Sequence, residues 1–213
     1  SAFEADCRRC PRLVGFLTQV KAQHPSYHAR PVAPFGVERP HLLIIGLAPG
    51  MHGANATGRP FTGDHAGILL YETLHQYGFS DRPVSHHRED GMQLLGCRIT
   101  NAVKCLPPAN KPSPQEVRTC SGYLRVEMQA LAPGGVVLAL GNVAHGAVIR
   151  ALGYKLRDYA FAHGAKHSLP DGRWLLNSYH CSRYNTQTKR LTTPMFQAVF
   201  AEVVSLLNAR GVD

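Results

Sequence analysis

The stretch HLLIIGLAPGMHGANATGRPFTGDHAG, residues 41–67, joins a short apolar run to a long glycine-rich loop. The run His41–Gly46 predicts a buried strand, because it is short, continuously apolar and followed at once by turn residues. The loop from Gly46 to Gly67 contains six glycines, too many for a helix interior, where glycine is destabilising. A glycine-rich loop directly after a strand indicates a ligand site at the end of that strand.

Apolar runs and helical patterns alternate along the rest of the chain. Three more strands are predicted, at Cys97–Val103, Gly135–Gly141 and Arg173–His180. Helices are predicted over about Cys10–Gln23, Ile68–Tyr77, Ser113–Leu131, Asn142–Leu152 and Thr193–Ala209, with Asn142 as a candidate N-cap. Short strands that alternate with helices predict a parallel sheet that helices cover on both faces.

The segments that follow the four predicted strands are rich in polar residues or glycine. In chain order they are GLAPG, TNAVKC, GNVAHG and SYHCSRYN. Ligands of parallel α/β sheets bind beyond the carboxyl ends of the strands. We therefore expect the four strand ends to converge on one site.

Length and composition suit one domain that spans residues 1–213, because no linker or repeat divides the chain. Hydrophobic residues make up 44% of the sequence, enough for a sizeable core. The net charge of +9 predicts a polyanionic partner such as nucleic acid, with a merely solvated basic surface as the alternative. The basic residues are spread along the chain, so the fold has to assemble any nucleic-acid surface.

The beginning of the sequence, SAFEADCRRC, has no apolar segment of the kind that secretory signals carry. No apolar stretch approaches the length that crosses a bilayer. We therefore expect a cytoplasmic protein without a membrane partner. We also expect the protein to be a monomer.

Four of the six cysteines form two pairs. Cys7 and Cys10 form C-x-x-C at the start of the first helix, and Cys105 and Cys120 flank a proline-rich loop. Four thiolates in two pairs suit tetrahedral zinc or a 4Fe–4S cluster. The second pair is split between a loop and a helix, unlike the tight knuckles of zinc ribbons, which favours a cluster over zinc or free thiols. Cys97 is expected to be a small core residue.

Three segments and these cysteines together resemble the uracil-DNA glycosylase superfamily, most closely its cluster-bearing B-type, or family 5. The segments are GLAPGMHGANATGRPFTGD, TNAVKCLPPANKPSP and SYHCSRYNTQT. The resemblance covers nearly the whole chain and implies a three-layer α/β/α sandwich on a central four-stranded parallel sheet. It also implies DNA repair by excision of deaminated bases in the nucleoid, and a mainly structural 4Fe–4S cluster. The resemblance assigns that cluster to Cys7, Cys10, Cys105 and Cys120.

The resemblance also implies a pocket for a flipped base. Phe61 resembles the aromatic residue that stacks on the base, with an ordinary core phenylalanine as the alternative. Asn101 carries an amide that can donate to O4 and accept from N3–H of uracil, with a turn asparagine as the alternative. His180 matches the histidine that donates to the base O2 and stabilises the departing anion.

Further residues are expected to contact the nucleotide or the surrounding DNA. The backbone is expected to approach the nucleotide at Gly46, Ala48 and Gly50. Phosphate or wedge contacts are expected from Ser178, Ser182, Arg183, Tyr184 and Asn185. Cys181 stands where many relatives have proline, and it is also a candidate nucleophile, although no sequence feature indicates a lowered pKa. Arg59 is expected either to hold the glycine-rich loop or to touch DNA.

The group that activates water is not obvious from the sequence. Better-known branches of the superfamily have Asp, Glu or Asn after the first strand, where this chain has Leu47 and Ala48, which cannot polarise water. Asp64 is the nearest carboxylate, and we expect it to orient water or to stabilise the sugar cation. Capping of the following helix is the alternative role of Asp64.

These observations predict a monofunctional DNA glycosylase that hydrolyses the N-glycosidic bond of uracil and leaves an abasic site. Other deaminated bases, such as hypoxanthine or xanthine, are expected as additional substrates. No lysine is placed like a Schiff-base nucleophile, so lyase activity is not expected. A non-catalytic iron–sulfur DNA-binding module is the alternative. A nucleotide-binding enzyme is disfavoured, because the loop has no G-K-[ST] and does not fit G-x-G-x-x-G.

Overall fold

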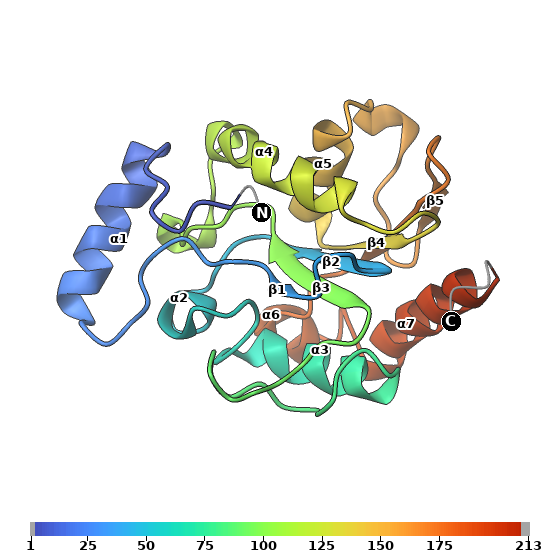
Figure 1. Ribbon diagram of the computed structural model, residues 1–213, viewed down its shortest axis with the longest axis horizontal. Coiled ribbons are helices and arrows are strands. Elements are labelled where there is room, and N and C mark those ends of the chain that lie inside the picture. The colour runs from blue at the N-terminus through green and yellow to red at the C-terminus, as the bar shows by residue number, and fades with distance from the viewer. Residues whose placement is uncertain (1–2, 210–213) are drawn as a thin grey trace.

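The centre of the fold is a six-stranded sheet, seen in a computed structural model that describes residues 3–209 (Figure 1). The strands are β1 (Phe35–Gly36), β2 (Leu42–Gly46), β3 (Cys97–Asn101), β4 (Val136–Leu140), β5 (Lys166–Ser168) and β6 (Trp174–Ser178), in the order β1-β3-β2-β4-β6-β5. The four central strands are parallel, as predicted, and β1 and β5 pair antiparallel at the two edges. The sequence pattern misses both edge strands, since two and three residues are too few to show alternation.

The helices agree with the predicted ones to within a few residues, and short helical segments occur in the loops between them. They are α1 (Pro11–Gln23), α2 (Ala54–Thr57), α3 (His65–Gln76), η1 (Pro108–Asn110), α4 (Pro114–Gln129), α5 (Asn142–Ala151), η2 (Leu156–Asp158), α6 (Arg183–Gln187) and α7 (Thr193–Asn208). The segments α2, α6, η1 and η2 are not predicted by the sequence, because five residues or fewer cannot show a helical period.

Side-chain caps fix where several of these helices begin. Ser113 and Glu116 form a capping box at α4, with Pro114 in its first turn. Thr192 caps α7 by accepting a hydrogen bond from the backbone of Met195. The prediction that Asn142 caps α5 is wrong: Gly141 is the N-cap, and Asn142 is the first helical residue.

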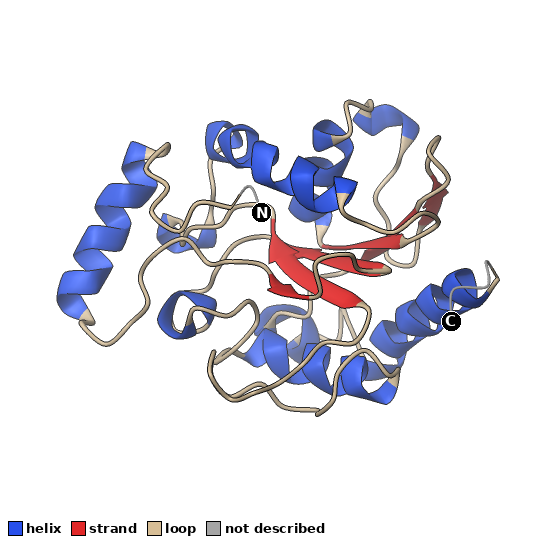
Figure 2. Cartoon of the chain, in the orientation of Figure 1, coloured by secondary structure: helices blue, strands red, loops and turns tan. Residues whose placement is uncertain are grey.

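Helices cover both faces of the sheet, as Figure 2 shows. Leu43 and Ile45 of β2 pack in one core with residues of α1, α4 and α5. Leu42 and Ile44 point to the opposite face and pack with residues of α3 and α7. Every residue of β2 and β4 is buried, which is typical of parallel strands between two helical layers. The expected α/β/α sandwich is therefore confirmed.

A buried ion pair ties β3 and its following loop to α4. Lys104 is 1% exposed, and its Nζ lies 2.9 Å from Oε2 of Glu127 and 2.9 Å from the backbone oxygen of Asn101. The ammonium group also donates to the hydroxyl of Thr100, which in turn donates to Glu127. Each polar group of this network therefore has a partner, as buried charges require.

Lys104→Met is expected to lower the free energy of unfolding by about 3–5 kcal/mol, because it leaves the buried carboxylate of Glu127 without its cation. Urea denaturation followed by circular dichroism measures the change. The matched control Lys166→Met removes the exposed pair with Glu202, for which about 0–1 kcal/mol is expected. Equal losses in the two variants would contradict a stabilising role for the buried pair.

None of the helices within residues 3–209 combines the length and the apolar character that a membrane-spanning segment needs.

Candidate active site

A pocket of about 460 Å³ lies at the carboxyl end of the central strands. Its lining comes from the segment between β2 and α3, from the start of α3, from the end of β3, from the η1 turn and from the segment after β6. The lining residues are Leu47, Ala48, Gly50, Ala54, Phe61, Asp64, His65, Ala66, Asn101, Asn110, His180, Ser182 and Arg183. Three of the four strand ends therefore converge, as predicted. The end of β4 does not line the pocket but supports it, since a Cβ on Gly141 would stand 3.6 Å from Cβ of His180.

Gly46 brings the two central strand ends into close contact. Gly46 and Asn101 are paired in register between β2 and β3. A Cβ on Gly46 would lie 2.5 Å from Oδ1 of Asn101 and 2.6 Å from Cζ of Phe61, so any side chain there would displace both. The absence of a side chain at Gly46 thus makes room for these two pocket residues, and the approach of the Gly46 backbone to a nucleotide stays a prediction. Asn101 itself is 4% exposed and lines the pocket.

Phe61 forms one wall of the pocket from an unusual backbone conformation. Its φ is +54°, in the left-handed region that non-glycine residues seldom adopt. Phe61 is 6% exposed, and its ring lies nearly parallel to the ring of His180, with 5.8 Å between the centroids and 26° between the planes. Phe61 therefore belongs to the core and also lines the pocket. Its stacking on a flipped base stays a prediction.

His180 enters the pocket as a neutral side chain. Burial disfavours the imidazolium and lowers the pKa of His180 to about 4. The amide of Asn185 donates to the backbone oxygen of His180 at 2.8 Å and so holds the segment after β6. The neighbouring Cys181 is fully buried, and burial raises the pKa of its thiol. The idea of Cys181 as a nucleophile is therefore wrong, because a buried neutral thiol is inert.

Asp64 caps a helix and also lines the pocket, and its catalytic role stays a prediction. Its Oδ1 accepts a hydrogen bond from the backbone of Gly67 at 3.0 Å, so it caps α3. The same carboxylate lines the pocket, and its Oδ2 lies against Gly53, where a Cβ would stand only 2.4 Å away. Burial raises the pKa of Asp64, and the backbone N–H groups of Gly67 and Ala66 oppose that shift.

The residues expected to face DNA lie in different surroundings, and the amide of Asn185 is engaged with the backbone oxygen of His180. Ser182 caps α6 and lines the pocket together with Arg183. Tyr184 projects from the surface with 70% of its area exposed. Ser178 is fully buried, and its hydroxyl donates to the backbone oxygen of Tyr179 at 2.8 Å, so as placed it cannot reach a phosphate.

Asn110 lines the pocket, and sequence reasoning missed it. It lies in η1, within the segment LPPANKP. That segment is part of one of the three motifs that carry the family resemblance, but no role is predicted for Asn110 from the sequence. Ala109 and Asn110 have φ values of +53° and +54°, and this left-handed turn carries Asn110 back over the pocket. The sequence did offer one signal for Asn110. It is an asparagine between prolines, and asparagine tolerates the left-handed conformation.

The chain is similar to known proteins over most of its length. The model of the uracil DNA glycosylase superfamily matches residues 33–204. The chain belongs to this superfamily. A protein of Thermus thermophilus named Type-5 uracil-DNA glycosylase is 46% identical, with 94% of this chain and 93% of the relative covered. Proteins of the same name from Mycobacterium leprae and Pyrobaculum aerophilum are 42% and 43% identical, covering 94% and 88% of this chain and 91% and 83% of their own.

The four cysteines expected to ligate a cluster line a second pocket in this superfamily member. It is formed by Cys7 and Cys10 before and at the start of α1, Cys105 after β3, and Cys120 within α4. Burial, followed by the neighbouring cysteines, raises the pKa of Cys105 to about 12. Cys97 lies elsewhere, fully buried in β3, as expected of a core residue.

Two polar groups at this second pocket suit a metal–sulfur group. The backbone N–H of Lys104 donates to Sγ of Cys120 at 3.4 Å. The buried hydroxyl of Tyr123 lines the same pocket and has no hydrogen-bond partner within residues 3–209. Donors of this kind surround cluster sulfurs in proteins. Within the same residues, no group of three or more His, Cys, Asp or Glu side chains could hold a metal ion as placed. The fit of a cluster therefore rests on the shared pocket, the four thiols and the two donors.

Proposed function

We propose that this protein removes uracil from DNA by hydrolysing the N-glycosidic bond, leaving an abasic site for repair. The observation that carries the proposal is the convergence of Phe61, Asp64, Asn101 and His180 on one pocket at the carboxyl edge of the sheet. Membership of the superfamily and the names of the relatives support it.

Base recognition begins with extrusion of the nucleotide, which costs a few kcal/mol of stacking and pairing, least at a mismatch such as U·G. Stacking on the ring of Phe61 offsets part of this cost, at about 1–3 kcal/mol per base. The amide of Asn101 then donates to O4 and accepts from N3–H. Cytosine presents the opposite donor and acceptor pattern at those two atoms, so the same amide discriminates against it.

Bond cleavage requires stabilisation of the departing base anion and a water for the sugar. Neutral His180 donates a hydrogen bond to the base O2 as negative charge develops there, which is electrostatic stabilisation of the transition state. Asp64 accepts a proton from the attacking water or stabilises the positive charge on the sugar. A partly buried carboxylate with a raised pKa suits this role, because the optimal pKa of a general base lies closer to the working pH.

The base range extends to other deaminated bases, including hypoxanthine and xanthine. Leu47 and Ala48 line the pocket and carry no polar side-chain group that could select one base by hydrogen bonding. An excision panel of uracil, hypoxanthine and xanthine against each partner base tests this extension.

The enzyme is monofunctional. Lys104 follows the pocket residue Asn101 by three positions, but its ammonium group is engaged with Glu127 and with the backbone of Asn101. A lysine held in this way cannot attack the sugar. Borohydride treatment during turnover is expected to trap no covalent adduct with DNA.

A 4Fe–4S cluster bound by Cys7, Cys10, Cys105 and Cys120 would join α1 to β3 and α4. The cluster would supply folding energy, because metal binding to sites of this kind is coupled to folding. Anaerobically purified protein is expected to contain about four iron atoms and four sulfides per chain. Cys105→Ser is expected to lower the iron content and the unfolding temperature. Unchanged iron content in that variant would contradict the ligand assignment.

A labelled duplex with a single U·G pair tests the function itself. After incubation and alkali treatment, a strand break is expected at the uracil. Retention of the duplex without a break would instead support a non-catalytic iron–sulfur DNA-binding module.

A further inference from the structure

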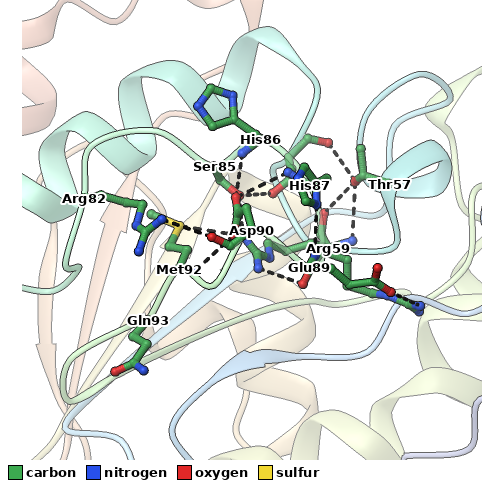
Figure 3. A network of polar contacts seen from close by, with 12 residues as sticks. Thr57, Arg59, Arg82, Ser85, His86, His87, Glu89, Asp90, Met92 and Gln93 are labelled. Atoms are coloured by element: carbon green, nitrogen blue, oxygen red, sulfur yellow. Dashed lines mark hydrogen bonds and ion pairs between the residues drawn. The ribbon is translucent and has the colours of Figure 1, made fainter.

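Arg59 lies two residues before Phe61, yet it does not line the base pocket. Its guanidinium belongs to a buried network of polar contacts (Figure 3). Only 3% of Arg59 is exposed. Its Nη1 donates to Oδ1 of Asp90 at 2.8 Å and to the hydroxyl of Ser85 at 2.9 Å, and its Nη2 donates to the backbone oxygen of Arg88 at 3.0 Å. The guanidinium also lies 4.2 Å from the ring centroid of Phe35, a distance that suits a cation–π contact. Of the two roles considered for Arg59, the structure therefore favours holding the loop.

The segment from Ser85 to Met92 is organised around the carboxylate that receives Arg59. Oδ2 of Asp90 accepts from the backbone N–H groups of His86 and His87 at 2.8 and 3.3 Å. Oδ1 accepts from the backbone of Met92 at 3.0 Å. The side chain of Asp90 is 6% exposed. This carboxylate thus presents a fixed anion to the glycine-rich loop.

The two neighbours of Phe61 are held as well. The hydroxyls of Thr62 and Ser85 are hydrogen-bonded at 2.7 Å. The hydroxyl of Tyr71 donates to the backbone oxygen of Pro60 at 2.8 Å. A residue with φ of +54° keeps that conformation only where its surroundings determine it, and here the surroundings are the Arg59–Asp90 pair and these two contacts.

We propose that the buried Arg59–Asp90 pair is a positioning element that holds the ring of Phe61 at the base pocket. The inference rests on the proposed function, because the position of Phe61 matters through the base that stacks on it. Arg59 does not line the base pocket, so its effect on excision passes through the loop.

A double-mutant cycle tests this indirect action. Arg59→Met is expected to lower kcat/KM on a U·G duplex by about 10- to 100-fold, since small misplacements of binding groups have effects of that order. In the Phe61→Ala background the same substitution is expected to change kcat/KM by less than about twofold, because the ring that it positions is already gone. Affinity for an undamaged duplex is expected to stay the same.

Two further variants separate positioning from folding and from charge. Asp90→Asn keeps the size of the side chain but removes the anion, and it is expected to reproduce the loss if Arg59→Met fails to fold. Arg88→Met removes a guanidinium from the same segment. Because the side chain of Arg88 is exposed and only its backbone oxygen meets Arg59, we expect wild-type activity from it. Circular dichroism and thermal melting confirm folding in each case.

The outcomes test the positioning role of Arg59 and Asp90 separately from the proposed excision of uracil. Folded Arg59→Met or Asp90→Asn protein with wild-type kcat/KM would overturn the positioning role alone. The positioning role would also be overturned if the loss of kcat/KM from Arg59→Met were as large in the Phe61→Ala background as in the wild-type protein. A wild-type chain that excises no uracil would overturn the proposed function, and the positioning role with it.

Discussion

Asp64→Asn is expected to lower the rate of uracil excision by about 10²–10⁴-fold, the range over which general bases contribute. The substitution removes the charge and the basicity of the carboxylate but keeps a side-chain oxygen for Gly67. Asparagine and aspartate cap helices about equally well, so the stability of α3 is expected to change by less than about 0.5 kcal/mol. Single-turnover excision kinetics and urea denaturation measure the two effects separately.

Asp64→Ala is the matched control for the capping role. It loses the cap as well as the carboxylate, and about 0.5–2 kcal/mol of stability is expected to go with it. If capping were the whole role of Asp64, the alanine variant would be destabilised and the asparagine variant would excise uracil at the wild-type rate. That result would remove Asp64 from the chemistry.

His180→Ala is expected to lower the excision rate by about 10²–10³-fold, the loss typical of removing one donor to a developing oxyanion. The donor is the neutral ring, because the pKa of His180 is about 4. The contribution of His180 to the rate is therefore expected to be flat between about pH 5 and 8. A rate that follows a histidine titration near pH 6.5 in the wild-type protein, and not in His180→Ala, would contradict the neutral donor.

The same lowered pKa predicts how His180 affects stability. The folded pKa of about 4 is below the ordinary value of 6.5, so the unfolded chain binds more protons between those two values. The contribution of His180 to the free energy of unfolding is fully present above about pH 6.5 and is lost as the pH falls toward about 4. The pH dependence of the free energy of unfolding is expected to be shallower in His180→Ala over that window.

The sequence predicts the fold well where its signals are long. Continuous apolar runs such as Leu42–Gly46 identify central strands, because strands that are buried on both faces are mostly apolar. Ser113 and Pro114 mark the start of α4 by local chemistry alone. The edge strand β1 depends on pairing with β3, a contact between distant segments that no local pattern records.

The residues of the candidate site are also predictable only where a local sequence pattern marks them. Phe61, Asp64 and His180 belong to recognisable motifs next to strand ends, and they do meet at one pocket. Asn110 reaches that pocket through a left-handed turn that sequence spacing does not encode. The partner of Arg59 is Asp90, which is 31 residues away, so only the folded chain identifies it.

Chromatographic detection of free uracil from a U·G duplex tests the central claim most directly. The wild-type protein is expected to release one uracil for each abasic site formed, and Asp64→Asn and His180→Ala are expected to release it far more slowly. A folded wild-type protein that leaves the uracil in the DNA, or that cuts the strand without releasing the free base, would contradict the account.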